Sequence, residues 1–133
     1  MKKRILIVDD HADFRTMVKD YINRNKLGVE VFEASTGEMG VVKASFVKPD
    51  IILMDINLPQ TNGLEAAKCV KEDHPHADII ILTTFDVGAF RKAAEKIKVR
   101  DFIGKHDVYD CLLPAIKKCL ETKTSHNSKR SGK

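Results

Sequence analysis

Five short segments rich in β-branched and apolar residues recur about every 25 residues along this 133-residue chain. Three of them contain four apolar residues in succession, as at positions 5–8, 51–54 and 79–82. Such runs are typical of strands that are buried on both faces of a parallel sheet. The segments that we expect to form strands are 4–10, 29–34, 50–55, 78–84 and 100–105.

The connections between these segments have apolar residues at the spacing of an amphipathic helix, i, i+3, i+4 and i+7. We expect one helix in each connection and a fifth after the last strand, each with its apolar stripe toward the core. The stripe residues are Phe14, Met17, Val18 and Tyr21; Met39, Val42 and Phe46; Leu64, Ala67 and Val70; Phe90, Ala93, Ala94 and Ile97; and Leu112, Leu113, Ile116 and Leu120.

Strands that alternate with helices indicate an α/β fold with a parallel sheet covered on both faces. Five such units in about 120 residues are too few for a closed eight-stranded barrel, and 133 residues are enough for one domain. We therefore expect an open, doubly wound, five-stranded parallel sheet, with right-handed connections.

The net charge of +4 is confined to the end of the chain. Residues 122–133 contain four basic residues and no acidic one, so residues 1–121 carry 19 of each sign. We interpret 1–121 as the domain and 122–133 as a basic flexible tail or linker stub, with a nucleic-acid-binding arm as the alternative. For the domain itself, the charge balance gives no reason to expect direct contact with nucleic acid.

The three cysteines, Cys69, Cys111 and Cys119, are odd in number and lack the spacing of metal ligands. Together with a start that reaches Asp9 and Asp10 too early for a signal peptide, they favour reduced thiols and a cytoplasmic location. No apolar run approaches the length of about 20 residues that spans a bilayer, so we expect no membrane association.

Polar side chains stand where the expected strands end. Asp9 and Asp10 follow the first apolar run, Asp55 the third and Thr83 the fourth, and Lys105 closes the fifth strand. Because the carboxyl ends of parallel strands meet at one edge of the sheet, and ligands bind there, we expect these five side chains to converge.

Three carboxylates at one edge would repel one another unless a cation joined them. Mg²⁺ suits such a set, since it prefers oxygen ligands and is often bound by one or two carboxylates plus phosphate oxygens. A metal, the Lys105 ammonium and the Thr83 hydroxyl around Asp55 form an environment that can hold a phosphoryl group on that carboxylate.

Four motifs, in this order and spacing, resemble the receiver domain of two-component response regulators: "ILIVDD", "IILMDINLPQTNGLEA", "IIILTTFD" and "DFIGK". The match covers residues 4 to about 120, and "LTTFD" is most similar to receivers of NarL/LuxR-type transcription factors. The resemblance implies the CheY-like (βα)5 fold with the flavodoxin-like strand order 2-1-3-4-5.

The same resemblance implies a role for each site residue. Asp55 would be the phosphoacceptor, and Asp9 and Asp10 would hold Mg²⁺ together with Asp55 and the backbone carbonyl of Asn57. Thr83 and Lys105 would contact phosphoryl oxygens. Phe102 would be the aromatic switch residue that turns inward on activation as Thr83 moves toward the phosphoryl group.

The implied partner is a sensor histidine kinase, and the implied output is a change of partner or a homodimer formed on phosphorylation. By the same resemblance, such a domain would not be an enzyme in the usual sense, although it would catalyse its own phosphotransfer and dephosphorylation. A NarL/LuxR-type regulator would continue past residue 121 into a DNA-binding domain. We therefore expect either a receiver excised from a longer transcription regulator or a receiver that works alone.

Two positions depart from the family pattern, and one glycine carries a separate expectation. Many receivers have proline where His106 follows Lys105, and a retained cis bond there would be a non-proline one, at about 3 kcal/mol. Lys98 stands where glycine often closes the fourth helix. Gly63, in the loop after Asp55, is expected to adopt a positive φ.

Two other classes of function remain open. A phosphatase of the haloacid-dehalogenase kind would use Asp55 as nucleophile and a second Asp two residues later as acid, but Asn57 stands there and cannot protonate a leaving group. A docking module with a receiver fold would not incorporate phosphate at all. The P-loop motif is absent from the sequence.

Overall fold

The computed structural model describes residues 2–58, 62–84 and 87–131, with the backbone alone for 87–91 and 122–131. Five strands alternate with five helices, and a short 3₁₀ helix, η1, precedes the last one. The elements are β1 (Lys3–Val8), α1 (Ala12–Arg24), β2 (Val29–Ala34), α2 (Gly37–Val47), β3 (Ile51–Asp55), α3 (Gly63–Asp73), β4 (Asp78–Thr83), α4 (Val87–Ile97), β5 (Asp101–Gly104), η1 (Lys105–Asp107) and α5 (Val108–Ser131).

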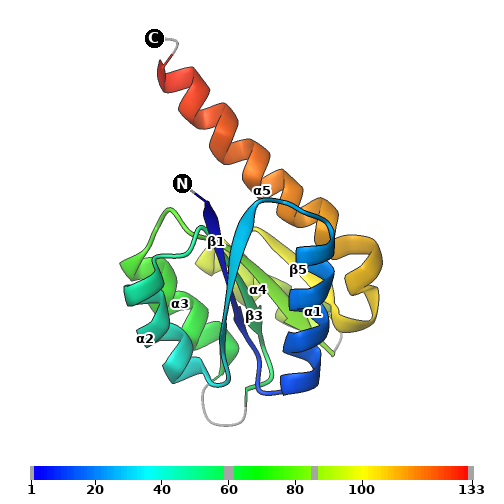
Figure 1. The fold of residues 1–133 in the computed structure, drawn as a ribbon. Coiled ribbons are helices and arrows are strands. Elements are labelled where there is room, and N and C mark those ends of the chain that lie inside the picture. The colour runs from blue at the N-terminus through cyan, green and yellow to red at the C-terminus, as the bar shows by residue number, and fades with distance from the viewer. Residues whose placement is uncertain (1, 59–61, 85–86, 132–133) are drawn as a thin grey trace.

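The strands form one parallel sheet in the order β2-β1-β3-β4-β5, which confirms the predicted fold. Helices cover both faces of the sheet, with α1 and α5 on one side and α2, α3 and α4 on the other (Figure 1). The predicted bounds are matched at β2, and β3 ends on Asp55 as predicted. β1, β4 and β5 end one or two residues earlier than predicted, before Asp9, Thr84 and Lys105. Asp9, Asp10 and Lys105 therefore lie just beyond the ends of β1 and β5.

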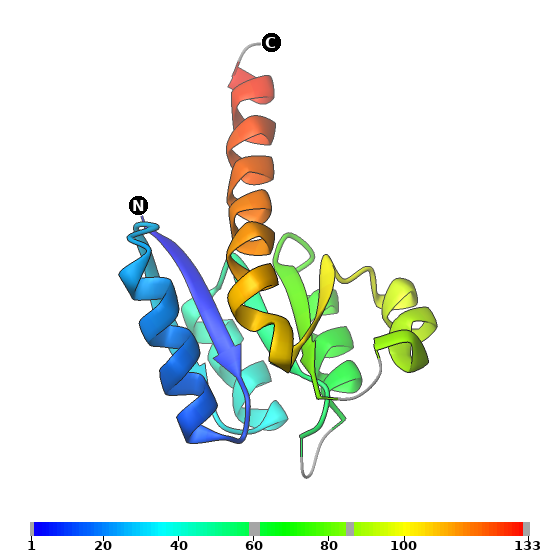
Figure 2. The same ribbon diagram turned by 90° about the vertical axis from the view of Figure 1, so that its right-hand side faces the viewer.

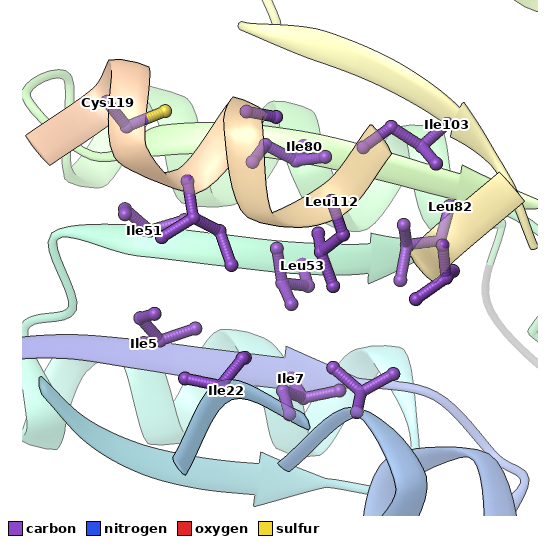
Figure 3. Packing of buried hydrophobic residues seen from close by; sticks show 14 residues of the cluster. Ile5, Ile7, Ile22, Ile51, Leu53, Ile80, Leu82, Ile103, Leu112 and Cys119 are labelled. Carbon is purple, nitrogen blue, oxygen red and sulfur yellow. The ribbon is translucent and has the colours of Figure 1, made fainter. Parts of the chain in front are cut away.

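Two apolar cores lie on the two faces of the sheet, because alternate residues of each central strand point in opposite directions. Ile5, Ile51 and Leu53 pack with α1 and α5, as Figure 3 shows. Their neighbours Leu6 and Ile52 pack against the helices on the other face. This burial on both sides explains the unbroken apolar runs in the sequence.

The predicted core stripe of α2 is wrong. Met39, Val42 and Phe46 are exposed, at 51%, 57% and 80%. The buried residues of α2 are instead the small ones, Gly37, Gly40 and Ala44. A Cβ on Gly40 would lie 2.8 Å from Val8 Cγ2, so the helix packs against β1 at a distance that only small residues allow. Steric fit, and not hydrophobicity, therefore decides which face of α2 is buried.

The other stripes largely follow the prediction. In α1 and α3 the stripe residues are buried or partly buried against the cores, and in α5 Leu112 and Ile116 are fully buried. In α4, Ala94 is buried and Ile97 partly buried, but Ala93 is exposed. Phe90 lies outside the residues whose side chains are described.

The last helix continues beyond the domain boundary that we expected at residue 121. α5 extends through Ser131 as one helix and projects from the body of the molecule (Figure 2). α5 contains Pro114, but neither glycine nor proline occurs in residues 115–131, so the sequence contains no strong signal that would end the helix earlier. In the described part of the chain, no helix is both long and apolar enough to span a membrane.

Both departures from the family pattern have a structural outcome. The described residues include no cis peptide bond, so the Lys105–His106 bond is trans. Lys98 has a φ of 65°, and the N–H of Val99 bonds back to the carbonyl of Ala94 at 3.4 Å. This is the left-handed helix end that favours glycine, as the resemblance implied.

Lys98→Gly is expected to stabilise the domain by about 0.5–1 kcal/mol. A side chain in the left-handed region costs about 1–2 kcal/mol, and the greater freedom of glycine in the unfolded chain offsets part of that gain. The measurement is urea unfolding. Lys96→Gly, inside the same helix, is the control and should lose about 1 kcal/mol. Equal effects of the two substitutions would contradict the prediction.

Candidate functional site

The three predicted carboxylates lie at the same edge of the sheet. β1 and β3 are neighbours with Val8 opposite Met54, so the next residues, Asp9 and Asp55, emerge side by side. Asp9 is 0% and Asp55 1% exposed, whereas the Asp10 side chain is 28% exposed. The strand from the middle of the molecule thus ends on a buried acid beside a second buried acid.

Lys105 provides the positive charge that this pair requires. Its Nζ lies 2.6 Å from Asp9 Oδ2 and 3.3 Å from Asp55 Oδ2, and its side chain is only 10% exposed. The ammonium also lies 4.4 Å from the ring centre of Phe14, so a π face covers part of it. η1 begins at Lys105 directly after β5, which brings this side chain back across the sheet edge.

The environment of Asp55 disfavours its charged form. Burial raises the pKa of the Asp55 carboxyl above its usual range, and the negative charge of Asp9 adds to the rise. The hydrogen bond from the Asn57 N–H to Asp55 Oδ1, at 3.0 Å, and the charge of Lys105 oppose it. The net effect is a raised pKa, so the ionised form of Asp55 at neutral pH lowers the stability of the folded domain.

Asp55→Asn is therefore expected to stabilise the metal-free domain at pH 7 by about 1 kcal/mol, or about 4 °C in Tm. A raised pKa in the folded state contributes stability at low pH, and that contribution is lost as pH rises through the folded pKa. The difference between the two proteins should therefore shrink as pH falls toward the usual range of Asp. Thermal unfolding at several pH values in a chelating buffer measures this.

Asp50→Asn is the matched control, because Asp50 stands at the opposite end of the same strand. Its Oδ2 accepts a hydrogen bond from the Arg4 N–H at 2.9 Å, and removal of that charge should not stabilise the fold. If Asp55→Asn fails to raise Tm at pH 7, as we expect for Asp50→Asn, then the ionised carboxylate of Asp55 does not lower the stability of the fold.

The donor set at this edge fits a hard divalent cation. Asp9, Asp10, His11 and Asp55 each offer one ligand atom, and these atoms all lie within 4.8 Å of one another. Asp9 Oδ2 and Asp10 Oδ1 are buried atoms with no hydrogen-bond partner, although Asp9 Oδ2 is ion-paired with Lys105. Buried carboxylate oxygens that lack donors are the groups that Mg²⁺ satisfies.

The remaining predicted residues lie around this cluster. The backbone N–H of Asn57 donates a hydrogen bond to the Asp55 carboxylate. The role of the Asn57 carbonyl as a metal ligand stays a prediction. Thr83 is fully buried at the last position of β4, and opposite Gly104 in register. Phe102 is partly buried against the core on the face of the sheet covered by α2, α3 and α4. Its rotation on activation stays a prediction.

Two residues at the site were not predicted from the sequence. His11 directs its Nδ1 at both acids of the Asp9–Asp10 pair, at 3.2 Å from an Oδ1 of each. Arg15 donates to the carbonyl of Asp9 at 2.6 Å and to Glu33 Oε1 at 3.0 Å, so it links the ends of β1 and β2. The available signal was their place in "DDHADFR", directly after the acidic pair.

Comparison with known proteins agrees with this geometry. The family model of the response regulator receiver domain matches residues 5–117. The chemotaxis protein CheY of Thermotoga maritima is 43% identical over 106 residues, which cover 79% of this chain and 87% of that protein. The transcriptional regulatory protein YdfI of Bacillus subtilis is 45% identical over 83 residues, 62% of this chain but only 38% of that protein.

Solved structures show the same fold. A LuxR-family two-component response regulator from Aurantimonas superposes with a TM-score of 0.83 at 28% identity, covering 92% of this chain and 87% of that one. The response regulator TrrA of Thermotoga maritima, solved in complex with Mg²⁺ and BeF, gives 0.78 at 29% identity, with coverage of 88% and 98%. The chain belongs to the response regulator receiver domain family.

Proposed function

We propose that this domain accepts a phosphoryl group on Asp55 from the phosphohistidine of a sensor histidine kinase in the cytoplasm. The observation that carries the proposal is the buried Asp55 carboxylate, with Lys105 Nζ 3.3 Å away and a second buried acid, Asp9, on the other side of that ammonium. A carboxylate held there by charge, and not by core packing, is suited to act as a nucleophile.

In the proposed step an Asp55 oxygen attacks phosphorus and forms an O–P bond. The N–P bond to the donor imidazole breaks, and its electron pair leaves with the ring nitrogen, which then takes a proton. Lys105 is close enough to pair with an oxygen of the transferred group. The main contributions of the protein are position and charge neutralisation, as in other phosphoryl transfers.

Mg²⁺ is the proposed cofactor, held by Asp9, Asp10, Asp55 and the carbonyl of Asn57. When bound, it would neutralise the carboxylates and the oxygens of the phosphoryl group. The similar TrrA structure was solved in complex with Mg²⁺ and BeF, which supports Mg²⁺ as the cofactor. The domain itself then acts as phosphate acceptor and as catalyst of its own modification, and not as an enzyme on other substrates.

The proposed consequence is a switch at the surface formed by α4, β5 and α5. The phosphoryl group carries about two negative charges where the carboxylate carried one, and it brings three acceptor oxygens. Thr83, at the end of β4, would move toward it, and Phe102 would turn into the space released. To change the active fraction from 1% to 99%, phosphorylation must favour the active form by about 5.5 kcal/mol. In the proposed switch this free energy comes from one added charge, the metal and two hydrogen bonds in the buried site.

For the output, we propose transcription control through a DNA-binding domain in the parent protein, with a homodimer or a new partner formed on phosphorylation. The match to YdfI, of which this chain spans 38%, and to the LuxR-family structure supports it. The match to CheY over 87% of that protein supports a receiver that works alone. In either case Asp55 does the same chemistry.

The test is intact mass after incubation with acetyl phosphate and Mg²⁺, on the wild type, Asp55→Asn and Asp73→Asn. Asp73 is an exposed acid at the end of α3 and serves as the matched control. We expect the wild type and Asp73→Asn to gain one phosphoryl group and Asp55→Asn to gain none. Addition of EDTA before the donor should abolish the gain.

Two outcomes would contradict the proposal. A phosphoryl group that persists in Asp55→Asn would place the acceptor elsewhere. No gain in the wild type, although Mg²⁺ binds by calorimetry, would mean that the site is silent toward this donor, and the docking-module alternative would then be preferred.

A further inference from the structure

His11 is held against the acidic pair by the turn that starts α1. It occupies the N-cap position of that helix, in an extended backbone conformation. Its backbone N–H donates to Asp9 Oδ1 at 2.8 Å, and its ring Nδ1 lies 3.2 Å from the same oxygen. The backbone contact therefore fixes the residue, and the ring folds back over the carboxylates.

The ring nitrogen is placed where a cation ligand would be. Nδ1 is also 3.2 Å from Asp10 Oδ1, an oxygen that is buried without a hydrogen-bond partner. It lies within 4.8 Å of the ligand atoms of Asp9, Asp10 and Asp55, so one ion can reach all four residues. The side chain is 66% exposed, so the ring contributes little to either core.

We infer that His11 Nδ1 is an additional ligand of this cation site, which therefore also accepts nitrogen-preferring divalent cations, the class of Zn²⁺ and Co²⁺. Carboxylates alone suit Mg²⁺, whereas imidazole is a preferred ligand of Zn²⁺ and of other late first-row metals. The inference rests on the proposed cation site and extends it: such an ion would compete with Mg²⁺ for the same three acids.

A purely structural role for His11 predicts something different. If the residue only held Asp9 in place through its backbone N–H, its side chain would affect all cations alike. Late first-row metals bind most sites more tightly than Mg²⁺ does, so a high Co²⁺ affinity alone carries no information. The deciding quantity is the ratio of Co²⁺ to Mg²⁺ affinity and its change when the imidazole is removed.

The experiment is calorimetric titration of the wild type, His11→Ser and His106→Ser with Mg²⁺ and, separately, Co²⁺. Serine is a good N-cap residue, so His11→Ser keeps the helix start and the backbone N–H. His106 follows Lys105 and its side chain is 78% exposed, so His106→Ser controls for adventitious binding by a surface histidine. We expect His11→Ser to lose about tenfold in Co²⁺ affinity, with less than a threefold change for Mg²⁺.

A second readout identifies the nitrogen directly. In protein labelled with ¹⁵N-histidine, Zn²⁺ should shift the Nδ1 resonance that is missing from His11→Ser, and leave that of His106 in place. A Co²⁺ to Mg²⁺ ratio that is unchanged in His11→Ser, or a shift confined to His106, would overturn the inference while Mg²⁺ binding and Asp55 phosphorylation persist. Absence of Mg²⁺ binding from the wild type would instead overturn the proposed cation site and the inference with it.

Discussion

Lys105→Met is expected to destabilise the domain by about 3 kcal/mol at pH 7 without added metal, measured by urea unfolding. The side chain is 10% exposed, and its Nζ is the cation between Asp9 Oδ2 at 2.6 Å and Asp55 Oδ2 at 3.3 Å. Methionine keeps most of the stem, so the change removes charge with little loss of packing. Removal of one partner of a buried ion pair leaves an uncompensated charge, at about 3–5 kcal/mol, and here two carboxylates are left.

The pH dependence separates this charge effect from a packing defect. Lys105 is one of the groups that hold down the pKa of Asp55, so in the variant protonation of the carboxylates becomes easier. The stability lost at pH 7 should return in part as pH falls, because a protonated carboxyl no longer repels its neighbour. Phosphoryl incorporation from acetyl phosphate should also fall at least about tenfold, since charge neutralisation is a main part of the chemistry.

Lys68→Met, on the exposed side of α3, is the matched control and should change stability by less than about 0.5 kcal/mol. If Lys105→Met is no worse than Lys68→Met at pH 7, or if its loss is the same at pH 5, Lys105 does not compensate the buried acids.

The convergence of Asp9, Asp55 and Lys105 could be predicted from the sequence because it depends on topology alone. In a parallel sheet every strand ends at the same edge, so polar residues that follow apolar runs meet there whatever the details of the helices. Thr83 and Gly104 are opposite each other for the same reason. The fold and the main site residues are therefore consequences of the order of apolar and polar segments.

His11 and the buried face of α2 could not be predicted in this way. His11 reaches the acids through the conformation of one turn, which hydrophobic periodicity does not describe. In α2 the apolar period indicated Met39, Val42 and Phe46, but the fully buried residues are the small ones on the opposite side of the helix. The position of His11 depends on local turn geometry, and the buried face of α2 depends on how closely the helix approaches β1.

The reason for glycine at position 63 was also not predicted correctly from the sequence. A positive φ was expected there, but among the described glycines only Gly28 has one. Gly63 is the first residue of α3, and its N–H donates to the carbonyl of Ile56 at 3.2 Å. A Cβ built on it would lie 2.1 Å from the carbonyl oxygen of Asp55 and 2.7 Å from Ile56 Cα. Glycine is required because two backbones touch, and not because of its own conformation.

Gly63→Ala is accordingly expected to destabilise the domain by about 3 kcal/mol in urea unfolding, at the upper end of the usual cost of overpacking. The atoms in the way are backbone atoms of the acceptor residue and its neighbour, so no side-chain rotation relieves the contact. Relief requires a shift of the chain at Asp55 itself. The same substitution should therefore slow phosphoryl incorporation from acetyl phosphate in the fraction that remains folded, since small displacements of a reacting group cost large factors in rate.

Gly104→Ala separates a steric effect at the acceptor from a general effect of alanine near the site. Gly104 directly precedes Lys105, but the nearest atoms to a Cβ there would be His106 Cε1 at 3.3 Å and Asp107 Oδ2 at 3.4 Å, both on exposed side chains that can move. We expect Gly104→Ala to cost less than about 1 kcal/mol and to leave incorporation nearly unchanged. If Gly63→Ala behaves like Gly104→Ala in both measurements, the α3 start and the end of β3 are not in fixed contact. If it loses stability but is phosphorylated at the wild-type rate, the contact supports the fold without positioning Asp55.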